Sequence, residues 1–116
     1  MAPRVVHFGC DDCRRLLVLH MAGYAVDDCP SILNLRSALL DSRQTDAVVF
    51  SEQDEKERRE AITLARSQSS APLILFETSN GPGDEAEFDL VIPPLTPPHE
   101  WLAKLAAAIQ QRGIVH

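Results

Sequence analysis

The sequence has no long apolar run, few aromatic residues and only three cysteines. No stretch approaches the roughly 18 apolar residues that a membrane-spanning helix needs. The first residues lead straight into a strand-like run, without the apolar segment and cleavage site of a secretory signal. An odd and small number of cysteines argues against a disulfide framework, so we expect reduced thiols. These absences predict a cytoplasmic protein.

Acidic residues outnumber basic ones and give the chain a formal net charge of −6. Nucleic-acid and membrane-surface binding both depend on clustered positive charge, so neither is expected. The 116 residues, 45% of them hydrophobic, suit one domain that spans 1–116 and forms its core without disulfides or metals. The acidic balance fits a protein that docks on other proteins.

Short apolar runs alternate with segments of helical spacing along the chain. The runs predict strands at 4–8, 24–29, 46–50, 72–76 and 88–92. Helices are predicted at 11–22, at 31–40, from 51 or 54 to 66, and at 97–112. The continuous apolar centre of 46–50 is typical of a strand that is covered on both faces. This alternation predicts a parallel sheet with helices on both faces.

Some helix faces and ends are also predicted. An apolar stripe at helical spacing is formed by Cys13, Leu16, Leu17 and His20, which places His20 at the edge of the core. The apolar face of the second helix is formed by Ile32, Leu35, Leu39 and Leu40. Thr96 is expected to cap the last helix and Gly113 to end it.

Four segments, taken in order, resemble landmarks of response-regulator receiver domains. GYAV at 23–26 resembles the entry to the second strand, and TDAVVF at 45–50 resembles the third strand, which leads to the phosphorylated aspartate. APLI at 71–74 and DLVIPPL at 89–95 resemble the fourth and fifth strands. The resemblance runs from about residue 4 to residue 109. It implies a flavodoxin-like, doubly wound three-layer α/β sandwich, with five parallel strands in the order 2-1-3-4-5.

Three positions that carry the chemistry of the family have changed. By the resemblance, the phosphoacceptor place falls on Ser51, whose hydroxyl cannot form an acyl phosphate. The hydroxyl place falls on Glu77, with Thr78 next to it, and the phosphate-binding lysine becomes Pro93. Proline has neither a side-chain donor nor a backbone N–H. The chain therefore resembles a degenerate receiver, or pseudo-receiver.

The acidic pair that binds Mg²⁺ in the family aligns near Val6 and His7. Asp11 and Asp12 follow a few residues later, either as displaced equivalents or as plain helix-capping residues. Mg²⁺ prefers octahedral oxygen ligands, usually carboxylates together with phosphate. No cofactor is therefore expected, unless Asp11 and Asp12 form a site for Mg²⁺.

The segment between the fourth and fifth strands also departs from the family. Residues 77–89 are too few for a full crossover helix, and NGPG at 80–83 marks an irregular turn. The fourth crossover helix is therefore predicted to be short or missing. Family members often use this region for output and dimerisation. The resemblance thus implies a non-enzymatic module that binds other signalling proteins, or a second copy of itself, through 80–87, the first helix or the flank of the sheet.

A competing motif is the C-x-x-C formed by Cys10 and Cys13 between a strand and a helix. Thioredoxin-like oxidoreductases place their thiols there, and a helix N-terminus stabilises a thiolate. Asp11 and Asp12 between the two thiols disfavour that charge. A zinc site that adds Cys29 and either His7 or His20 to this pair has enough ligand types but no recognisable ligand spacing. A thiol redox domain is the alternative function.

Two further readings are weaker. A binder of small ligands at the sheet rim would fit the fold class, but the sequence has no glycine-rich phosphate loop. Ser51 is not expected to act as a nucleophile, because no histidine can be placed beside it from the sequence.

Overall fold

The computed structural model describes residues 2–9, 14–41, 44–51, 55–77 and 88–114. The strands are β1 (Arg4–Phe8), β2 (Ala25–Cys29), β3 (Ala47–Phe50), β4 (Leu73–Phe76) and β5 (Leu90–Ile92). The helices are α1 (Arg15–Met21), α2 (Ile32–Leu40), α3 (Glu55–Gln68) and α4 (Pro98–Ile114).

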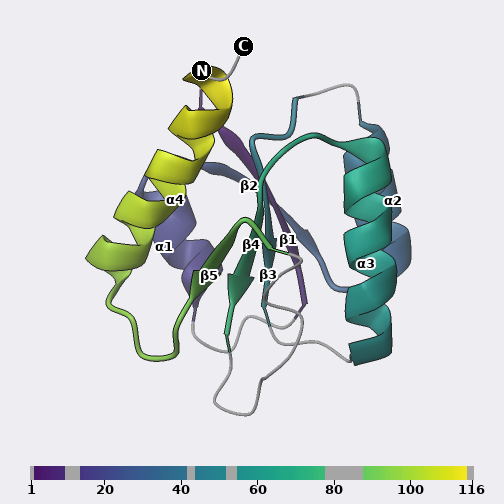
Figure 1. The fold of residues 1–116 in the computed structure, drawn as a ribbon, viewed down its shortest axis with the longest axis horizontal. Helices are drawn as coiled ribbons and strands as arrows, with labels where there is room; N and C mark the ends of the chain where they lie inside the picture. Colours follow the sequence, from purple (N-terminus) through teal and green to yellow (C-terminus); the bar gives the residue numbers. More distant parts are fainter. Residues whose placement is uncertain (1, 10–13, 42–43, 52–54, 78–87, 115–116) are drawn as a thin grey trace.

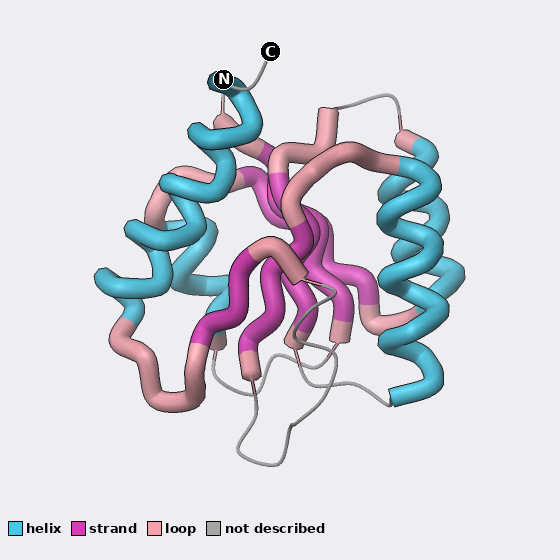
Figure 2. The backbone as a smooth tube through the Cα atoms, viewed as in Figure 1, coloured by secondary structure: helices cyan, strands magenta, loops and turns pink. Residues whose placement is uncertain are grey.

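The five strands form one parallel sheet in the order β2-β1-β3-β4-β5. Figure 1 shows α1 and α4 on one face of the sheet and α2 and α3 on the other. Figure 2 shows the resulting three layers, with the strands between two pairs of helices. The predicted flavodoxin-like fold class and strand order are confirmed.

Side chains on successive residues of a strand point to opposite faces, so the sheet divides the core in two. Val6, Phe8, Val48 and Phe50 pack with α2 and α3. The strand residues between them, such as Val5 and Val49, pack with Leu19, Trp101 and Leu105 of α1 and α4. Continuous apolar strands are thus explained by burial on both sides.

The end of α1 and the start of α2 each depend on one particular residue. Gly23 has a φ of 99°, in the left-handed region that glycine enters at little cost, and it links α1 to β2. Ser31 caps α2, since its hydroxyl oxygen accepts a hydrogen bond from the Asn34 amide at 3.3 Å.

The structure confirms part of the predicted faces of α1 and α2 and corrects the rest. Leu35 and Leu39 of α2 are buried, and Leu16 of α1 packs against the core. His20 is exposed, and so are Leu17 and Leu40. The buried residue of α1 is Leu19, which the predicted stripe did not include. Short helices have several apolar positions, and packing against the sheet selects among them.

The ends of three helices also differ from the predictions. Ser51 lies outside α3, which begins at Glu55. Thr96 donates a hydrogen bond to the Pro93 carbonyl at 2.7 Å, and α4 begins at Pro98. Gly113 lies within α4, not after it.

Residues 78–87 lie outside the described part of the chain, and so does most of the predicted fourth crossover. Among the described residues, no helix is long and apolar enough to cross a membrane.

Candidate functional site

Ser51 directly follows β3 at the carboxyl edge of the sheet, where parallel α/β sheets bind their ligands. Its amide donates a hydrogen bond to the Phe8 carbonyl of β1 at 2.9 Å. Its side chain is only 1% exposed. A buried hydroxyl needs a hydrogen-bond partner, because an unpaired one loses its hydration without compensation.

The partner of Ser51 is His7, in the middle of the buried strand β1. The Nε2 atom of His7 lies 2.7 Å from the Ser51 hydroxyl oxygen. The Nδ1 atom lies 3.0 Å from a carboxylate oxygen of Asp28 in β2. His7 is directly opposite Asp28 in the register of β1 and β2, and opposite Val49, two residues before Ser51, in β3. Three neighbouring strands therefore bring the three side chains together on the face that α1 and α4 cover.

The hydrogen-bonding capacity of these groups determines which atom donates and which accepts in each of the two hydrogen bonds. An ionised carboxylate only accepts, so Nδ1 of His7 carries a proton and donates it to Asp28. In the neutral ring Nε2 then accepts, and the Ser51 hydroxyl donates to it. This is the order of donors in a Ser-His-Asp triad, in which the imidazole is the base for the hydroxyl.

In a serine hydrolase the serine is accessible and the aspartate is buried, and in this triad the order is reversed. His7 has no exposed surface and Ser51 almost none, whereas the Asp28 side chain is 52% exposed. The carboxylate therefore faces solvent, and the hydroxyl lies inside. A peptide or other large substrate cannot reach Ser51 in this arrangement.

The sequence analysis named His7 without pairing it with Ser51, did not name Asp28, and rejected Ser51 as a nucleophile because no histidine could be placed beside it. The structure places a histidine there, since Nε2 of His7 lies within hydrogen-bond distance of the Ser51 hydroxyl. The available signal was a histidine inside an apolar strand, because a polar side chain buried in a central strand needs partners on the adjacent strands. The order 2-1-3 places β1 between the strands that carry those partners.

Of the other predicted site residues, Glu77 and Pro93 lie within the described part of the chain. Glu77 follows β4 and is half-buried, with its amide donating to the Ile92 carbonyl at 2.9 Å. Pro93 is exposed and lines a separate groove. Cys10, Asp11, Asp12, Cys13 and Thr78 lie outside the described residues.

Metal binding finds little support at this edge. Ser51 supplies no carboxylate at the acceptor place, and the Asp28 carboxylate is engaged with His7. Within the ranges that the structure describes, no three His, Cys, Asp or Glu side chains gather as a metal site would require. The prediction of a Mg²⁺ site on Asp11 and Asp12 falls outside those ranges.

Cys29 ends β2 as a buried, reduced thiol. Burial first, and then the charges of Asp27 and Asp28, raise its pKa to about 11 against an opposing effect of Arg4. A thiol with such a pKa is protonated at neutral pH and is a poor nucleophile or metal ligand.

An apolar groove of about 330 Å³ lies between α1 and the loop that joins β5 to α4. Val18, Phe76, Ile92 and Trp101 are among its lining residues. The Arg15 guanidinium lies 4.1 Å from the centre of the Phe76 ring. Leu95, at the rim, is 99% exposed and has a φ of 64°. The structure thus holds a leucine in solvent beside an apolar groove.

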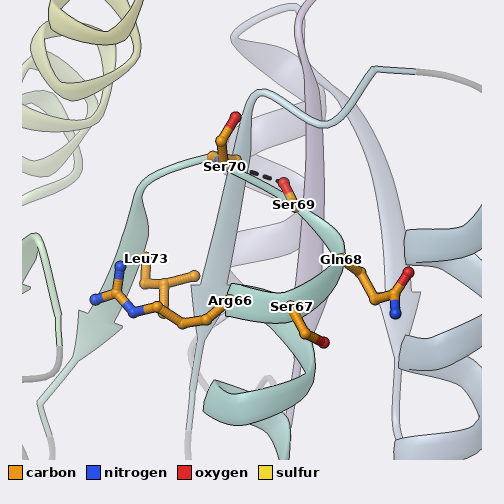
Figure 3. Close-up of a pocket in the computed structure, with 7 residues that line it drawn as sticks. Arg66, Ser67, Gln68, Ser69, Ser70 and Leu73 are labelled. Carbon is orange, nitrogen blue, oxygen red and sulfur yellow. Dashed lines mark hydrogen bonds between the residues drawn. The ribbon is translucent and has the colours of Figure 1, made fainter.

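A second groove, of about 480 Å³, lies at the opposite edge of the sheet, where α3 turns into β4 (Figure 3). Ser67, Ser69 and Ser70 line it, and Ser69 accepts a hydrogen bond from the Ala71 amide at 3.0 Å. Arg66, also in the lining, lies 3.9 Å from the Asp89 carboxylate. The groove is larger than the first, but it lies away from the Ser51 cluster.

Comparison with known proteins gives a likeness in structure without one in sequence. No family model matches the chain, and the search of curated proteins found no match. The signal receiver domain of an HD domain-containing protein from Pseudomonas fluorescens Pf-5 superposes with a TM-score of 0.77 at 17% identity, covering 97% of this chain and 98% of that chain. The chemotaxis response regulator CheY4 of Vibrio cholerae has a TM-score of 0.71 at 18% identity, covering 93% and 99%.

A structure named as adenylate cyclase from Rhodopirellula baltica is also similar, with a TM-score of 0.75 at 14% identity and coverage of 96% of this chain and 90% of that one. The TM-scores show that these proteins share the fold of this chain, although the sequence identities are low. The resemblance to receiver domains that the sequence suggested is confirmed at the level of the fold.

Proposed function

We propose that the chain is a receiver-like module of a two-component or phosphorelay-type pathway. In this proposal it binds other signalling proteins, is not switched by aspartate phosphorylation and has no catalytic turnover. The receiver fold supports the signalling role. The observation that supports the proposal is the residue after β3, a buried serine hydrogen-bonded to His7. The resemblance to receiver domains gives this position to the reactive carboxylate. Such a hydroxyl cannot store energy as an acyl phosphate.

The test is the intact mass of the protein after incubation with acetyl phosphate and Mg²⁺ under reducing conditions. We expect no adduct that hydroxylamine removes. A phosphorylatable receiver domain, treated in parallel, shows that the reagent is active. A labile phosphoryl adduct would instead identify a carboxylate acceptor and return phosphorylation to the mechanism.

The proposed docking surface is the exposed side of α1 together with Leu95. Leu17 and Met21, one helical turn apart, are largely exposed, and Val18 beside them lines the apolar groove. Contiguous exposed apolar side chains at a groove are typical of protein–protein interaction sites. We therefore place the partner over α1 and the β5–α4 loop.

A photoreactive cross-linker at His20 on the exposed side of α1 tests this placement. We expect Leu17→Glu with Met21→Glu to abolish cross-linking to the partner, because burying two carboxylates opposes docking. Leu33→Glu on α2, equally exposed but on the other face of the sheet, is the matched control and should leave cross-linking unchanged. Equal loss in both variants would place the partner elsewhere. A cross-link between two copies of the chain would identify a homodimer as the complex.

The thiol redox alternative has no support from the described sheet. In thioredoxin-like folds, the strand that follows the proline near the thiols is part of an antiparallel hairpin. Here β4 follows Pro72 and pairs with β5 in parallel.

A further inference from the structure

The hydrogen-bonded triad of Ser51, His7 and Asp28 is arranged for a reaction that the partner-binding proposal does not use. We propose that Ser51 is an activated nucleophile that accepts one acyl group from a small, uncharged activated ester. The inference stands apart from the proposed function, because it concerns the reactivity of the cluster and not docking or phosphorylation.

The geometry supplies both elements of activation. The 2.7 Å contact aligns the Ser51 hydroxyl with Nε2, the free basic nitrogen of the imidazole. The 3.0 Å contact with Asp28 holds the ring in that tautomer and stabilises the positive charge that forms when the ring takes the proton. An adjacent base of this kind makes a serine hydroxyl reactive. Exposed serines elsewhere, such as Ser37 on α2, have no histidine partner among the described residues.

The step is an acyl transfer. The Ser51 oxygen attacks the ester carbonyl carbon and forms a new C–O bond, while its proton passes to Nε2 of His7. The bond from the carbonyl carbon to the leaving oxygen breaks, and the departing alcohol takes the proton from His7. The products are acyl-Ser51 and one alcohol, with no oxidant or reductant involved.

Charge and burial select the donor. The Asp28 carboxylate beside the ring repels a dianionic phosphoryl donor, whereas a neutral ester carries no such penalty. Since Ser51 is buried, only a small reagent reaches it, through local opening of the strand ends. When the strand ends close again, the acyl group on Ser51 is buried, and hydrolysis needs a further opening. We therefore expect one stoichiometric acylation and no turnover.

The experiment uses p-nitrophenyl acetate with the full chain, followed by peptide mapping of acetylated residues over time. We expect acetylation at Ser51 to be about 100-fold or more faster than at Ser37, since a positioned general base typically contributes 10²–10⁴-fold. Because this comparison is made within the wild-type protein, it does not depend on how any variant folds. Acetylation of Ser51 no faster than that of Ser37 would overturn the proposal.

Two variants separate the roles. Ser51→Ala should lose the rapid release of one equivalent of p-nitrophenolate, and Ser37→Ala should keep it. Asp28 acts as a positioning residue, so Asp28→Asn should slow acetylation of Ser51 by about tenfold or more and shift the downfield Nδ1 proton resonance of His7. Asp28→Glu should restore part of both. An unchanged rate in a folded Asp28→Asn protein would remove Asp28 from the mechanism and contradict the proposed relay.

Discussion

At the scale of single residues, buried polar side chains of β1 are paired with acidic residues of β2 on both faces of the sheet. His7 meets Asp28 on one face. Arg4, which is 4% exposed, meets Asp27 on the other, with Nε 2.9 Å from the carboxylate. A buried charge without such a partner would be strongly unfavourable. Asp27 and Asp28 also place charge on an edge strand, which disfavours pairing with another chain.

The Arg4 guanidinium also joins two elements to the sheet. It donates hydrogen bonds to the Thr45 hydroxyl at 3.0 Å and to the Ala38 carbonyl of α2 at 2.8 Å. We expect Arg4→Ala to lower the free energy of unfolding by about 3 kcal/mol, because it removes the ion pair with Asp27 together with the hydrogen bonds to Thr45 and Ala38. Urea denaturation measures the change. Arg36→Ala, on the exposed side of α2, should stay within about 0.5 kcal/mol of wild type. Equal effects of the two variants would show that the Arg4 network does not stabilise the fold.

Cys29 gives a prediction about reactivity and pH. With a pKa of about 11, raised from 9.0, its thiol is protonated through the neutral range. Only the thiolate reacts, so in a Cys10→Ser, Cys13→Ser background iodoacetamide should modify Cys29 about 100-fold more slowly than an ordinary thiol at pH 8. The rate should rise about tenfold per pH unit until the pKa is passed. The same variant in urea is the control and should react at the ordinary rate. Fast alkylation in the folded state would mean that Cys29 is accessible.

At the scale of elements, the β5–α4 loop departs from ordinary backbone preference at Leu95, one of two described non-glycine residues with a positive φ, the other being Arg14 before α1. Leu95 has a φ of 64°, a conformation that costs an ordinary L-residue about 1–2 kcal/mol. Strain that persists in a structure is often found at functional positions. This loop also bounds the apolar groove, which is why it belongs to the proposed docking surface.

A reciprocal pair of variants tests the backbone argument. Leu95→Gly should raise the free energy of unfolding by about 0.5–1 kcal/mol, because glycine enters the left-handed region freely. Gly23→Ala should lower it by about 1 kcal/mol, although a methyl group at Gly23 would meet no atom within 4 Å. Thermal and urea denaturation report both. If Leu95→Gly also weakens partner cross-linking, the Leu95 side chain contributes to docking, and if it destabilises the protein, the backbone entropy that glycine adds to the unfolded state outweighs the strain.

The elements that the sequence predicted well are those whose pattern is set by burial on two faces. Residues 46–50 and 72–76 could only be buried strands, and β3 and β4 lie within them. The face of α1 was wrong, because seven residues give too few turns for one stripe to be distinguished. The cap of α4 was also misplaced, since Thr96 turned back to Pro93 instead of forward into the helix.

At the scale of the whole molecule, the strand order was predictable and the site was not. Alternating strands and helices with receiver-like landmarks led to 2-1-3-4-5. The triad depends on register, because a shift of one residue between β1 and β2 would turn Asp28 away from His7. Neither the alternation nor the spacing of the sequence sets that register. It follows from packing both sides of the sheet at once.

Because the sheet divides the core in two, substitutions on one face should be energetically coupled to each other, and substitutions on opposite faces should not. Phe8 and Phe50 lie on the α2–α3 face with ring centres 5.9 Å apart, at an interplanar angle of 68°. Val49 adjoins Phe50 in the chain but packs on the α1–α4 face. In double-mutant cycles we expect Phe8→Leu and Phe50→Leu to couple by about 0.5–1.5 kcal/mol, as edge-to-face aromatic pairs do.

Phe50→Leu and Val49→Ala should instead add to within about 0.5 kcal/mol, because their side chains share no partners. Urea denaturation of the three single and two double variants measures both quantities, with equal slopes confirming that unfolding stays two-state. Strong coupling between Val49 and Phe50 would mean that strain passes through the strand itself. The two faces would then not behave as independent cores, and a change in the α1–α4 layer, where the Ser51 cluster and the proposed docking surface lie, would be felt in the α2–α3 layer.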